Sequence, residues 1–244
     1  MSFDPGRLAG LDEPVRRYFT HAIGDGAPLA PGVRLEMKGR VKADLWLPFR
    51  ADEEVDGRSF SWRARVGLGP LTLFRIEDGY AHGVGSTDGR LLGRRRLFHS
   101  SDEDTARSAA GRAALESAVF APAGVLPERG VAWRAEGEET IVARFDLPPE
   151  RPEVELRIDG KGAVKSASAS RWGPAGDGTF EYIPCGCDVR AERSFGDLTI
   201  ASSVTVSWRY GTPRQAPFLR AEITAAVSGP FGSTLGTSGV PGSG

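Results

Sequence analysis

The stretch Val33-Arg34-Leu35-Glu36-Met37-Lys38 decides the fold class, because apolar and charged side chains alternate along it. Alternation with a period of two is typical of a strand that has one buried and one exposed face. Comparable runs occupy residues 41–49, 59–66, 71–77, 80–85, 90–98, 131–135, 140–145, 154–158, 163–171, 179–183, 188–195, 198–210 and 218–227. A series of short alternating runs predicts a mainly β protein with an antiparallel meander rather than βαβ units.

Asp-Gly pairs separate several of these runs and predict tight turns. They stand at residues 56–57, 78–79 and 88–89, and Asp-Gly favours the positive φ angles of two-residue hairpin loops. On this prediction Tyr80 and His82 lie on one strand between two turns, and their side chains share a face.

Two segments depart from the strand pattern and predict helices. Residues 12–23 carry apolar side chains at helical spacing, with Asp12 as the N-cap and Pro14 in the first turn. Residues 101–120 are rich in alanine and end before Pro122. A face of small side chains lets a helix approach a sheet closely, so we expect this second helix to lie across or close the mouth of a barrel.

The length and composition predict one domain. A chain of 244 residues with 40% hydrophobic residues can bury a single large core. We expect this domain to span residues 1–228, and the Gly- and Ser-rich segment 229–244 to be a disordered tail. A net charge of -1 disfavours nucleic-acid binding. The sequence shows neither an apolar run that would insert into a membrane nor a secretory signal, which predicts a cytoplasmic protein; its oligomeric state is left open.

Signatures of several enzyme classes are missing from the sequence. It has no Walker loop, no Gly-x-Ser-x-Gly elbow and no His-Glu-x-x-His pair. The three histidines are scattered, and the two cysteines, Cys185 and Cys187, have no partner cluster for a metal site. The sequence therefore predicts no metal and no cofactor, with both cysteines as reduced thiols.

Aromatic side chains on the predicted strands are candidates for the wall of an apolar pocket, although each could instead simply fill the core. The candidate ligand-binding residues are Trp46, Phe49, Phe60, Trp62, Trp133, Arg171, Trp172, Trp208 and Tyr210. An internal Arg171 would need a carboxylate or a ligand anion as its partner.

Three further residues are candidates for acid–base chemistry. Tyr80 and His82 would place a phenol beside an imidazole, or form an ordinary structural pair. Glu116 would be a buried carboxylate in the pocket, or pair with Arg112 one helical turn away as a surface ion pair.

The chain resembles a bacterial family of unknown function within the superfamily of LolA-like, lipoprotein-carrier-type half-barrels. The resemblance runs from about residue 11 to 227 and departs from the family pattern near Val119 and Phe120, where a tryptophan is usual. The stretches that carry it include Glu13-Pro14-Val15-Arg16-Arg17-Tyr18-Phe19, Asp78-Gly79-Tyr80, Arg171-Trp172-Gly173 and Trp208-x-Tyr210-Gly211-Thr212. It implies an antiparallel sheet curled into an incomplete barrel, and it implies no established reaction.

These observations lead to a binding function for a hydrophobic small molecule. The first hypothesis adds a cofactor-free cyclisation or isomerisation of a polyketide- or terpenoid-like secondary-metabolite intermediate, which would work by folding the substrate into a reactive conformer. The alternatives are a non-catalytic carrier or sensor of a lipid or other small molecule, and an interaction module without a ligand.

Overall fold

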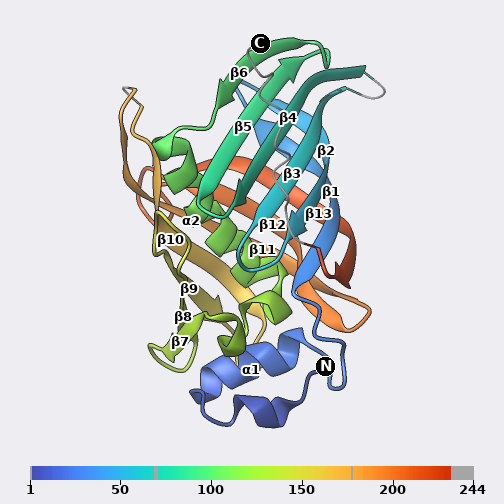
Figure 1. Cartoon of the computed structure of the whole chain (residues 1–244), viewed down its shortest axis with the longest axis vertical. Coiled ribbons are helices and arrows are strands. Elements are labelled where there is room, and N and C mark those ends of the chain that lie inside the picture. The colour runs from blue at the N-terminus through green and yellow to red at the C-terminus, as the bar shows by residue number, and fades with distance from the viewer. Residues whose placement is uncertain (1, 69–70, 177, 232–244) are drawn as a thin grey trace, which may run out of the picture.

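The computed structural model describes residues 2–68, 71–176 and 178–231. In this part of the chain, 13 strands form one antiparallel sheet in the order β6-β5-β4-β3-β2-β1-β13-β12-β11-β10-β9-β8-β7 (Figure 1). The strands are β1 Gly32–Lys42, β2 Trp46–Val55, β3 Phe60–Leu68, β4 Leu71–Ala81, β5 Val84–Leu91, β6 Arg95–Ser100, β7 Ala132–Ala135, β8 Thr140–Arg144, β9 Glu153–Ile158, β10 Val164–Pro174, β11 Phe180–Phe195, β12 Leu198–Trp208 and β13 Ala216–Gly229.

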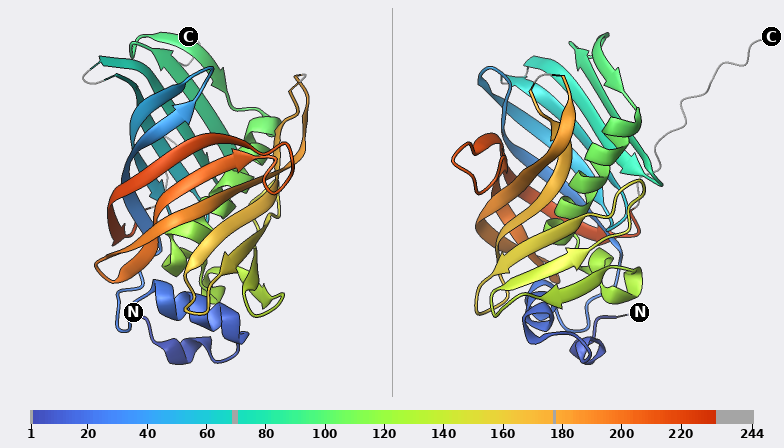
Figure 2. Two further views of the ribbon diagram at one scale, coloured as in Figure 1. Left: turned by 180° about the vertical axis from the view of Figure 1, so that it is seen from behind. Right: turned by 90° about the vertical axis from the view of Figure 1, so that its left-hand side faces the viewer.

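The sheet consists of two meanders joined at its centre. Strands β1 to β6 follow one another on one side, β7 to β13 on the other, and β1 pairs with β13 from Gly32↔Gly229 to Val41↔Leu219. Figure 2 shows the resulting sheet curled around its inner face. Because β6 and β7 end the hydrogen-bonded order of the described strands, the barrel is not closed. The predicted fold class, an antiparallel, curled, half-open barrel, is confirmed.

The long helix α2, Glu103–Phe120, lies along the inner face and contacts both meanders (Figure 2). Asp102 caps it by accepting a hydrogen bond from the Thr105 amide at 2.8 Å. Its buried side chains are mostly alanines, and a Cβ on Gly85 of β5 would lie only 2.7 Å from the Ala106 Cα. The small-residue face therefore allows the close helix–sheet contact that the sequence predicts.

The shorter helix α1, Glu13–Ala22, covers one end of the curled sheet (Figure 1). Its Tyr18 hydroxyl donates a hydrogen bond to the carbonyl of Ala118 in α2 at 2.9 Å, and burial raises the pKa of Tyr18. The rings of Tyr18 and Phe19 pack against Trp133 of β7 at centroid distances of 5.3 and 5.2 Å. Both predicted helices are thus present within one or two residues of their expected bounds. Three single 3-10 turns complete the helical part, at Pro5–Leu8, Pro122–Val125 and Pro127–Arg129.

Two of the three predicted Asp-Gly turns are wrong. Asp78-Gly79 lies within β4 and Asp88-Gly89 within β5, whereas the chain reverses at His82-Gly83, with φ angles of 51° and 82°. The turn at Asp56-Gly57 is present. Asp78 stays in the ladder opposite Trp62, so strand pairing overrides the local turn preference there.

This shift of the turn also corrects the expected relation of Tyr80 and His82. Tyr80 is buried near the end of β4, while His82 is exposed in the turn with a positive φ. The two residues therefore do not share one strand face.

At the C-terminal end, the predicted tail begins too early, because Gly229 is still paired with Gly32 in the sheet and the ring of Phe231 lies 4.3 Å from the Arg34 guanidinium carbon. Residues 232–244 of the predicted tail lie outside the described residues. None of the described helices has the length and apolar character needed to cross a lipid bilayer.

Candidate ligand-binding site

A cavity of about 280 Å³ lies on the inner face of the sheet, between α2 and strands of both meanders. This volume is close to the lower end of the range for small-molecule pockets, about 300–1,000 Å³. Its lining is mainly apolar: Met37, Val41, Trp62, Ile76, Leu115, Val119, Phe120, Cys185, Gly186, Cys187, Val204, Val206, Trp208, Phe218, Leu219, Ala221 and Ile223, with Glu53, Asp78, Arg112, Glu116 and Arg171 as charged members.

Aromatic side chains form two parts of the wall. Trp208 stacks on Phe218 with a centroid distance of 5.8 Å and an interplanar angle of 25°. Trp62 packs against Phe49 on the neighbouring strand at 5.9 Å. Each ring is held by a neighbouring aromatic side chain, so these parts of the wall are fixed before any ligand enters.

One end of the cavity is charged and is organised by Arg112 of α2. Its Nε lies 2.7 Å from Glu116 Oε1, its Nη1 lies 2.7 Å from Asp78 Oδ2, and its Nη2 lies 3.8 Å from Glu53 Oε1. The guanidinium carbon also stands 4.5 Å from the centroid of the Phe60 ring. We call Arg112, Glu53, Asp78 and Glu116 the Arg112 cluster.

The strands bring the carboxylates of this cluster together by register. Glu53 of β2 pairs with Trp62 of β3, and Trp62 pairs with Asp78 of β4, so all three face inward in one row across the sheet. Thr87 of β5 extends the row, because it pairs with Asp78 and its hydroxyl donates to Asp78 Oδ1 at 2.5 Å. Helix α2 then supplies Arg112 and Glu116 from above.

The electrostatics of the Arg112 cluster favour a proton on Glu53. Burial raises the pKa of Glu53 well above its ordinary value, and the nearby Glu116 raises it further, while Arg112 acts in the opposite direction. Burial also disfavours the charge on Arg112, but Glu116, Asp78 and Glu53 together hold its pKa above the ordinary value. In the Arg112 cluster, one cation therefore lies among three carboxyl groups. Glu53, with its raised pKa, retains its proton to a higher pH than an exposed glutamate does.

Arg171 of β10 is the second cation at the cavity, and its partners are neutral. Its Nε donates to the Ser108 carbonyl at 2.9 Å and its Nη2 to the Ser108 hydroxyl at 3.2 Å, both on α2. Its guanidinium carbon lies 4.9 Å from the centroid of the Trp208 ring. Gly111 provides the space, since a Cβ there would lie 2.8 Å from the Arg171 Cγ. Among the described residues, Arg171 has no carboxylate within ion-pair distance.

The two cysteines are buried in the cavity wall as free thiols. Burial raises the pKa of Cys185, and it raises that of Cys187 to about 12. The thiolate is the reactive form of cysteine, so at neutral pH both side chains act as apolar wall rather than as nucleophiles.

The sequence matches a family of unknown function, DUF6544, over residues 1–221. The chain belongs to the DUF6544 family. Membership in a family of unknown function agrees with the resemblance seen in the sequence, and no curated protein matches the chain.

Two solved structures resemble the chain in backbone arrangement. One is a DUF1329 family protein from Desulfovibrio piger, with a TM-score of 0.48 and 5% sequence identity. The other, from Vibrio parahaemolyticus, carries the description of an outer membrane lipoprotein-sorting protein domain and has a TM-score of 0.44 with 7% identity. In each case the match covers 82% of this chain and 86% of the other.

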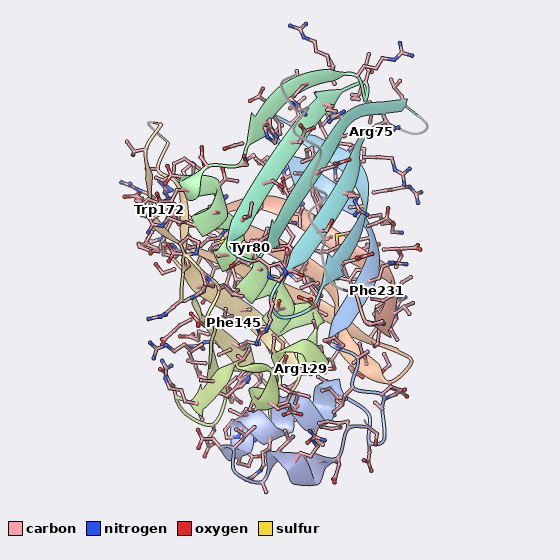
Figure 3. The ribbon with its side chains drawn as sticks, in the orientation of Figure 1. Arg75, Tyr80, Arg129, Phe145, Trp172 and Phe231 are labelled. Carbon is pink, nitrogen blue, oxygen red and sulfur yellow. The ribbon has the colours of Figure 1, made fainter. Side chains whose placement is uncertain are left out.

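Four of the residues proposed from the sequence meet at the cavity: Trp62, Arg171, Trp208 and Glu116. The other proposed wall residues serve elsewhere. Trp46 lies beneath Arg220 at 4.7 Å, Trp133 packs on α1, and the Trp172 indole donates to Asp104 at 2.7 Å near the edge of the molecule (Figure 3). Phe49 and Phe60 are buried behind the cavity wall.

The remaining proposed residues also lie away from the cavity: two tyrosines form structural hydrogen bonds and His82 is exposed. The Tyr210 hydroxyl donates to Asp188 at 2.7 Å. The Tyr80 hydroxyl donates to the Pro148 carbonyl at 2.7 Å, and burial raises its pKa to about 12. His82 is exposed in its turn. The expected phenol–imidazole pair is therefore not brought to the cavity.

Glu53 and Asp78 are site residues that the sequence analysis did not identify. Both interrupt a row of inward-facing apolar side chains: Glu53 stands between Ala51 and Val55, and Asp78 between Ile76 and Tyr80. A charge on the apolar face of a strand is a signal that was available in the sequence. Arg112 was considered only as a surface partner of Glu116, whereas it is the centre of a largely buried cluster.

A larger open hollow of about 790 Å³ is lined by strands β1 to β4, β12 and β13. Its lining includes the charged side chains of Lys38, Arg50, Arg65 and Glu222. The smaller cavity under α2 is the better candidate site, because it is enclosed by apolar wall and contains buried charges.

Replacing Glu53 with glutamine is expected to stabilise the protein at neutral pH, with a gain that grows as pH rises. Below the ordinary value of 4.5, Glu53 carries its proton in both the folded and unfolded states, so the substitution has little effect. Above it the unfolded chain releases the proton while the folded state retains it, so wild-type stability falls as pH rises toward the raised pKa. Glutamine does not titrate, so its advantage should appear as a free energy of unfolding that exceeds the wild-type value increasingly between acidic and neutral pH.

Urea unfolding at a series of pH values measures this difference. The control is Glu222→Gln, at a side chain that is 63% exposed, where the difference should stay near zero across the series. A difference for Glu53→Gln that does not change with pH would contradict the expected proton on Glu53.

Proposed function

We propose that the protein binds a hydrophobic small molecule in the cavity under α2 and anchors an anionic group of that molecule at Arg171. The observation that carries this proposal is the guanidinium of Arg171 in the wall of an apolar cavity. Its described hydrogen-bond partners, the carbonyl and hydroxyl of Ser108 and the sulfur of Cys185, carry no formal charge in the thiol state. Arg171 is partly buried, and a charge held partly out of water without a counter-ion gains from pairing with a ligand carboxylate.

The apolar wall supplies the rest of the affinity. Each Å² of apolar ligand surface removed from water contributes about 25 cal/mol. The wall is held in place by packing and by the Arg112 cluster, so little conformational entropy is lost when the ligand enters. A fatty acid of medium length has the size and the chemistry that the cavity accepts.

Titration with decanoate, decanol and decylamine tests the proposal. Trp62 and Trp208 line the cavity, so binding should change the intrinsic tryptophan fluorescence in a saturable way. We expect decanoate to bind about tenfold or more tightly than decanol, because a charged hydrogen bond to a buried guanidinium is worth about 1.5–3 kcal/mol, and decylamine to bind most weakly. Arg171→Met should remove the preference for decanoate over decanol.

A substitution that fills the cavity tests whether the ligand binds there, and the same substitution at an exposed position is its matched control. Ala221→Phe places a ring in the cavity and should abolish binding, whereas Ala216→Phe on the exposed start of the same strand should leave it unchanged. Val206→Phe is a second filling variant, should Ala221→Phe fail to fold. If neither filling variant weakens binding, or if no ligand gives a saturable change, the site is wrong and an interaction module without a ligand becomes the better reading.

A second candidate function is acid-catalysed isomerisation or cyclisation of the bound molecule, and the position of Glu53 in the cavity lining together with its raised pKa favours it. A carboxyl group kept neutral in an apolar cavity can protonate a substrate double bond or carbonyl. Asp78, Glu116 and the wall aromatics would then stabilise the positive charge that develops. Tyr80 and His82 have no role in this proposed reaction.

Mass spectrometry of the ligand recovered after incubation with a cell extract separates carrier from catalyst. A ligand recovered unchanged supports the carrier. Conversion that is lost in Glu53→Gln, while Glu222→Gln retains it, supports the catalyst.

A further inference from the structure

We infer that the ends of three neighbouring hairpins form a surface that docks on membranes containing anionic lipids. The hairpins are β1–β2, β3–β4 and β5–β6. The apolar part of this tip surface is Leu45, Leu68, Leu71 and Leu92, and its basic part is Lys42, Arg75, Arg94 and Arg95. This inference is independent of what the cavity binds.

The register of the sheet places the three hairpin ends side by side. Lys42 pairs with Trp46, Leu68 with Leu71, and Leu91 with Arg95, each as the last pair before a loop at the same end of the meander. The strand order β6-β5-β4-β3-β2-β1 makes the hairpins direct neighbours, so their ends stand about 10 Å apart. Figure 1 shows the end of the β5–β6 hairpin at the top of the molecule, beside the described parts of β3 and β4, and Figure 3 places Arg75 in the same region.

Each hairpin end exposes leucine to solvent. Leu45 is 74% exposed, Leu68 62%, Leu71 55% and Leu92 58%. Single exposed leucines are common on protein surfaces, but here each of three adjacent hairpins exposes at least one leucine at the same end of the sheet. Exposed apolar side chains gathered on one side of a molecule are typical of interaction sites.

The same hairpin ends are strongly basic, although the whole chain has a net charge of only -1. Segments 40–46, 65–68, 71–75 and 90–96 contain eight arginine or lysine residues and a single acidic residue, Asp44. Arg65, Arg90 and Arg96 pair with carboxylates on the outer face of the sheet. Lys42, Arg75, Arg94 and Arg95 are exposed and form no ion pair within the described part of the chain.

Exposed leucines together with exposed basic side chains at the hairpin ends fit a lipid surface better than a protein partner. The leucines stand on separate hairpin ends rather than in one flat patch, and a fluid bilayer can receive separate apolar side chains without a complementary shape. The described strand residues of the three hairpins are paired up to Lys42↔Trp46, Leu68↔Leu71 and Leu91↔Arg95. The leucines can therefore reach the membrane interface without bringing unpaired strand backbone into lipid. Arginine and lysine then meet the lipid phosphates, where each contributes to binding at a negative surface.

Flotation of the full chain with vesicles tests the inference. We expect binding to vesicles of phosphatidylcholine and phosphatidylglycerol in a three-to-one ratio, weak binding to phosphatidylcholine alone, and a fall in binding as salt is raised. Arg94→Gln with Arg95→Gln should weaken binding to the mixed vesicles about tenfold or more. Leu45→Ser, Leu68→Ser and Leu92→Ser together should also weaken it at least about tenfold.

Matched variants away from the hairpin ends are the controls. Arg144→Gln with Arg157→Gln removes two exposed arginines of β8 and β9, and Val84→Ser with Val227→Ser removes two exposed valines. These controls should bind as the parent does. All substituted side chains are exposed, and thermal unfolding checks that each variant is folded.

A local probe gives a second, independent measurement. Leu68→Cys and Val84→Cys are labelled with an environment-sensitive fluorophore, which the buried Cys185 and Cys187 should react with slowly. Mixed vesicles should increase the emission at position 68 but not at 84. The inference is overturned if the parent chain does not bind mixed vesicles, if both labels respond equally, or if the controls lose as much binding as the hairpin variants. Absence of vesicle binding would leave an acidic protein as the partner to consider for this surface.

Discussion

Replacing Arg112 with methionine is expected to lower the free energy of unfolding by about 3–5 kcal/mol, the range measured when one partner of a buried ion pair is removed. The side chain is the one cation that touches Glu53, Asp78 and Glu116 in the described structure. Methionine keeps much of the volume and the contact with Phe60 but leaves the carboxylates to repel one another. Denaturant unfolding at neutral pH measures the loss.

The loss in Arg112→Met should shrink under acidic conditions, because protonation of the carboxylates removes their mutual repulsion. The control is Arg134→Met, which breaks ion pairs with Glu136 and Glu153 on the surface and should cost at most about 1 kcal/mol. Equal losses in the two variants would show that the Arg112 cluster is no more tightly organised than a surface network.

Gly57→Ala is expected to be destabilising to a similar degree, by roughly 2–5 kcal/mol from backbone strain and overpacking together. Gly57 has a φ of 90° in the turn between β2 and β3, and a Cβ there would lie 2.3 Å from the Gly124 carbonyl oxygen. Both atoms of this contact are fixed to backbone, so relief requires the turn to move away from the segment that follows α2.

Gly196→Ala separates the two causes. Gly196 also has a positive φ, 61°, but no atom lies within 4 Å of its added Cβ. This control should cost only about 1–2 kcal/mol, the penalty of the left-handed conformation alone. Thermal or denaturant unfolding of both variants measures the difference; if the two losses are the same, the contact with Gly124 contributes nothing.

The fold class could be predicted from the sequence because alternation of side chains is a local signal that the sheet preserves. The run from Val33 to Lys38 is buried and exposed in the expected order. The turns were less predictable. Asp78-Gly79 has the composition of a hairpin loop, but Asp78 is held in β4 by its ladder partner and by Arg112. His82-Gly83 turns instead, and nothing in the local sequence favours histidine at a positive φ over aspartate.

The site was predictable in part for the same reason. Trp62, Trp208, Arg171 and Glu116 line the cavity. The two tryptophans and Arg171 lie in runs that the alternation predicts as strands, whereas the pattern around Glu116 fits a buried carboxylate and a surface ion pair equally well. Trp46, Trp133 and Trp172 have the same residue type but lie at the ends or edges of the sheet, which depends on strand order and not on local pattern. The row formed by Glu53, Trp62 and Asp78 arises from the register of three strands, and a single sequence does not contain that register.

The pairing of β1 with β13 at the middle of the sheet has a consequence for the order of folding. Every other neighbour in the sheet is the next strand along the chain, so each meander can form from nearby contacts alone. The central seam instead joins Gly32 to Gly229, and closing so long a loop is slow because its entropy is lost before the new contacts form. We therefore expect each half to form early from its own neighbouring strands, and the cavity between them to be completed only when the last strand reaches the first.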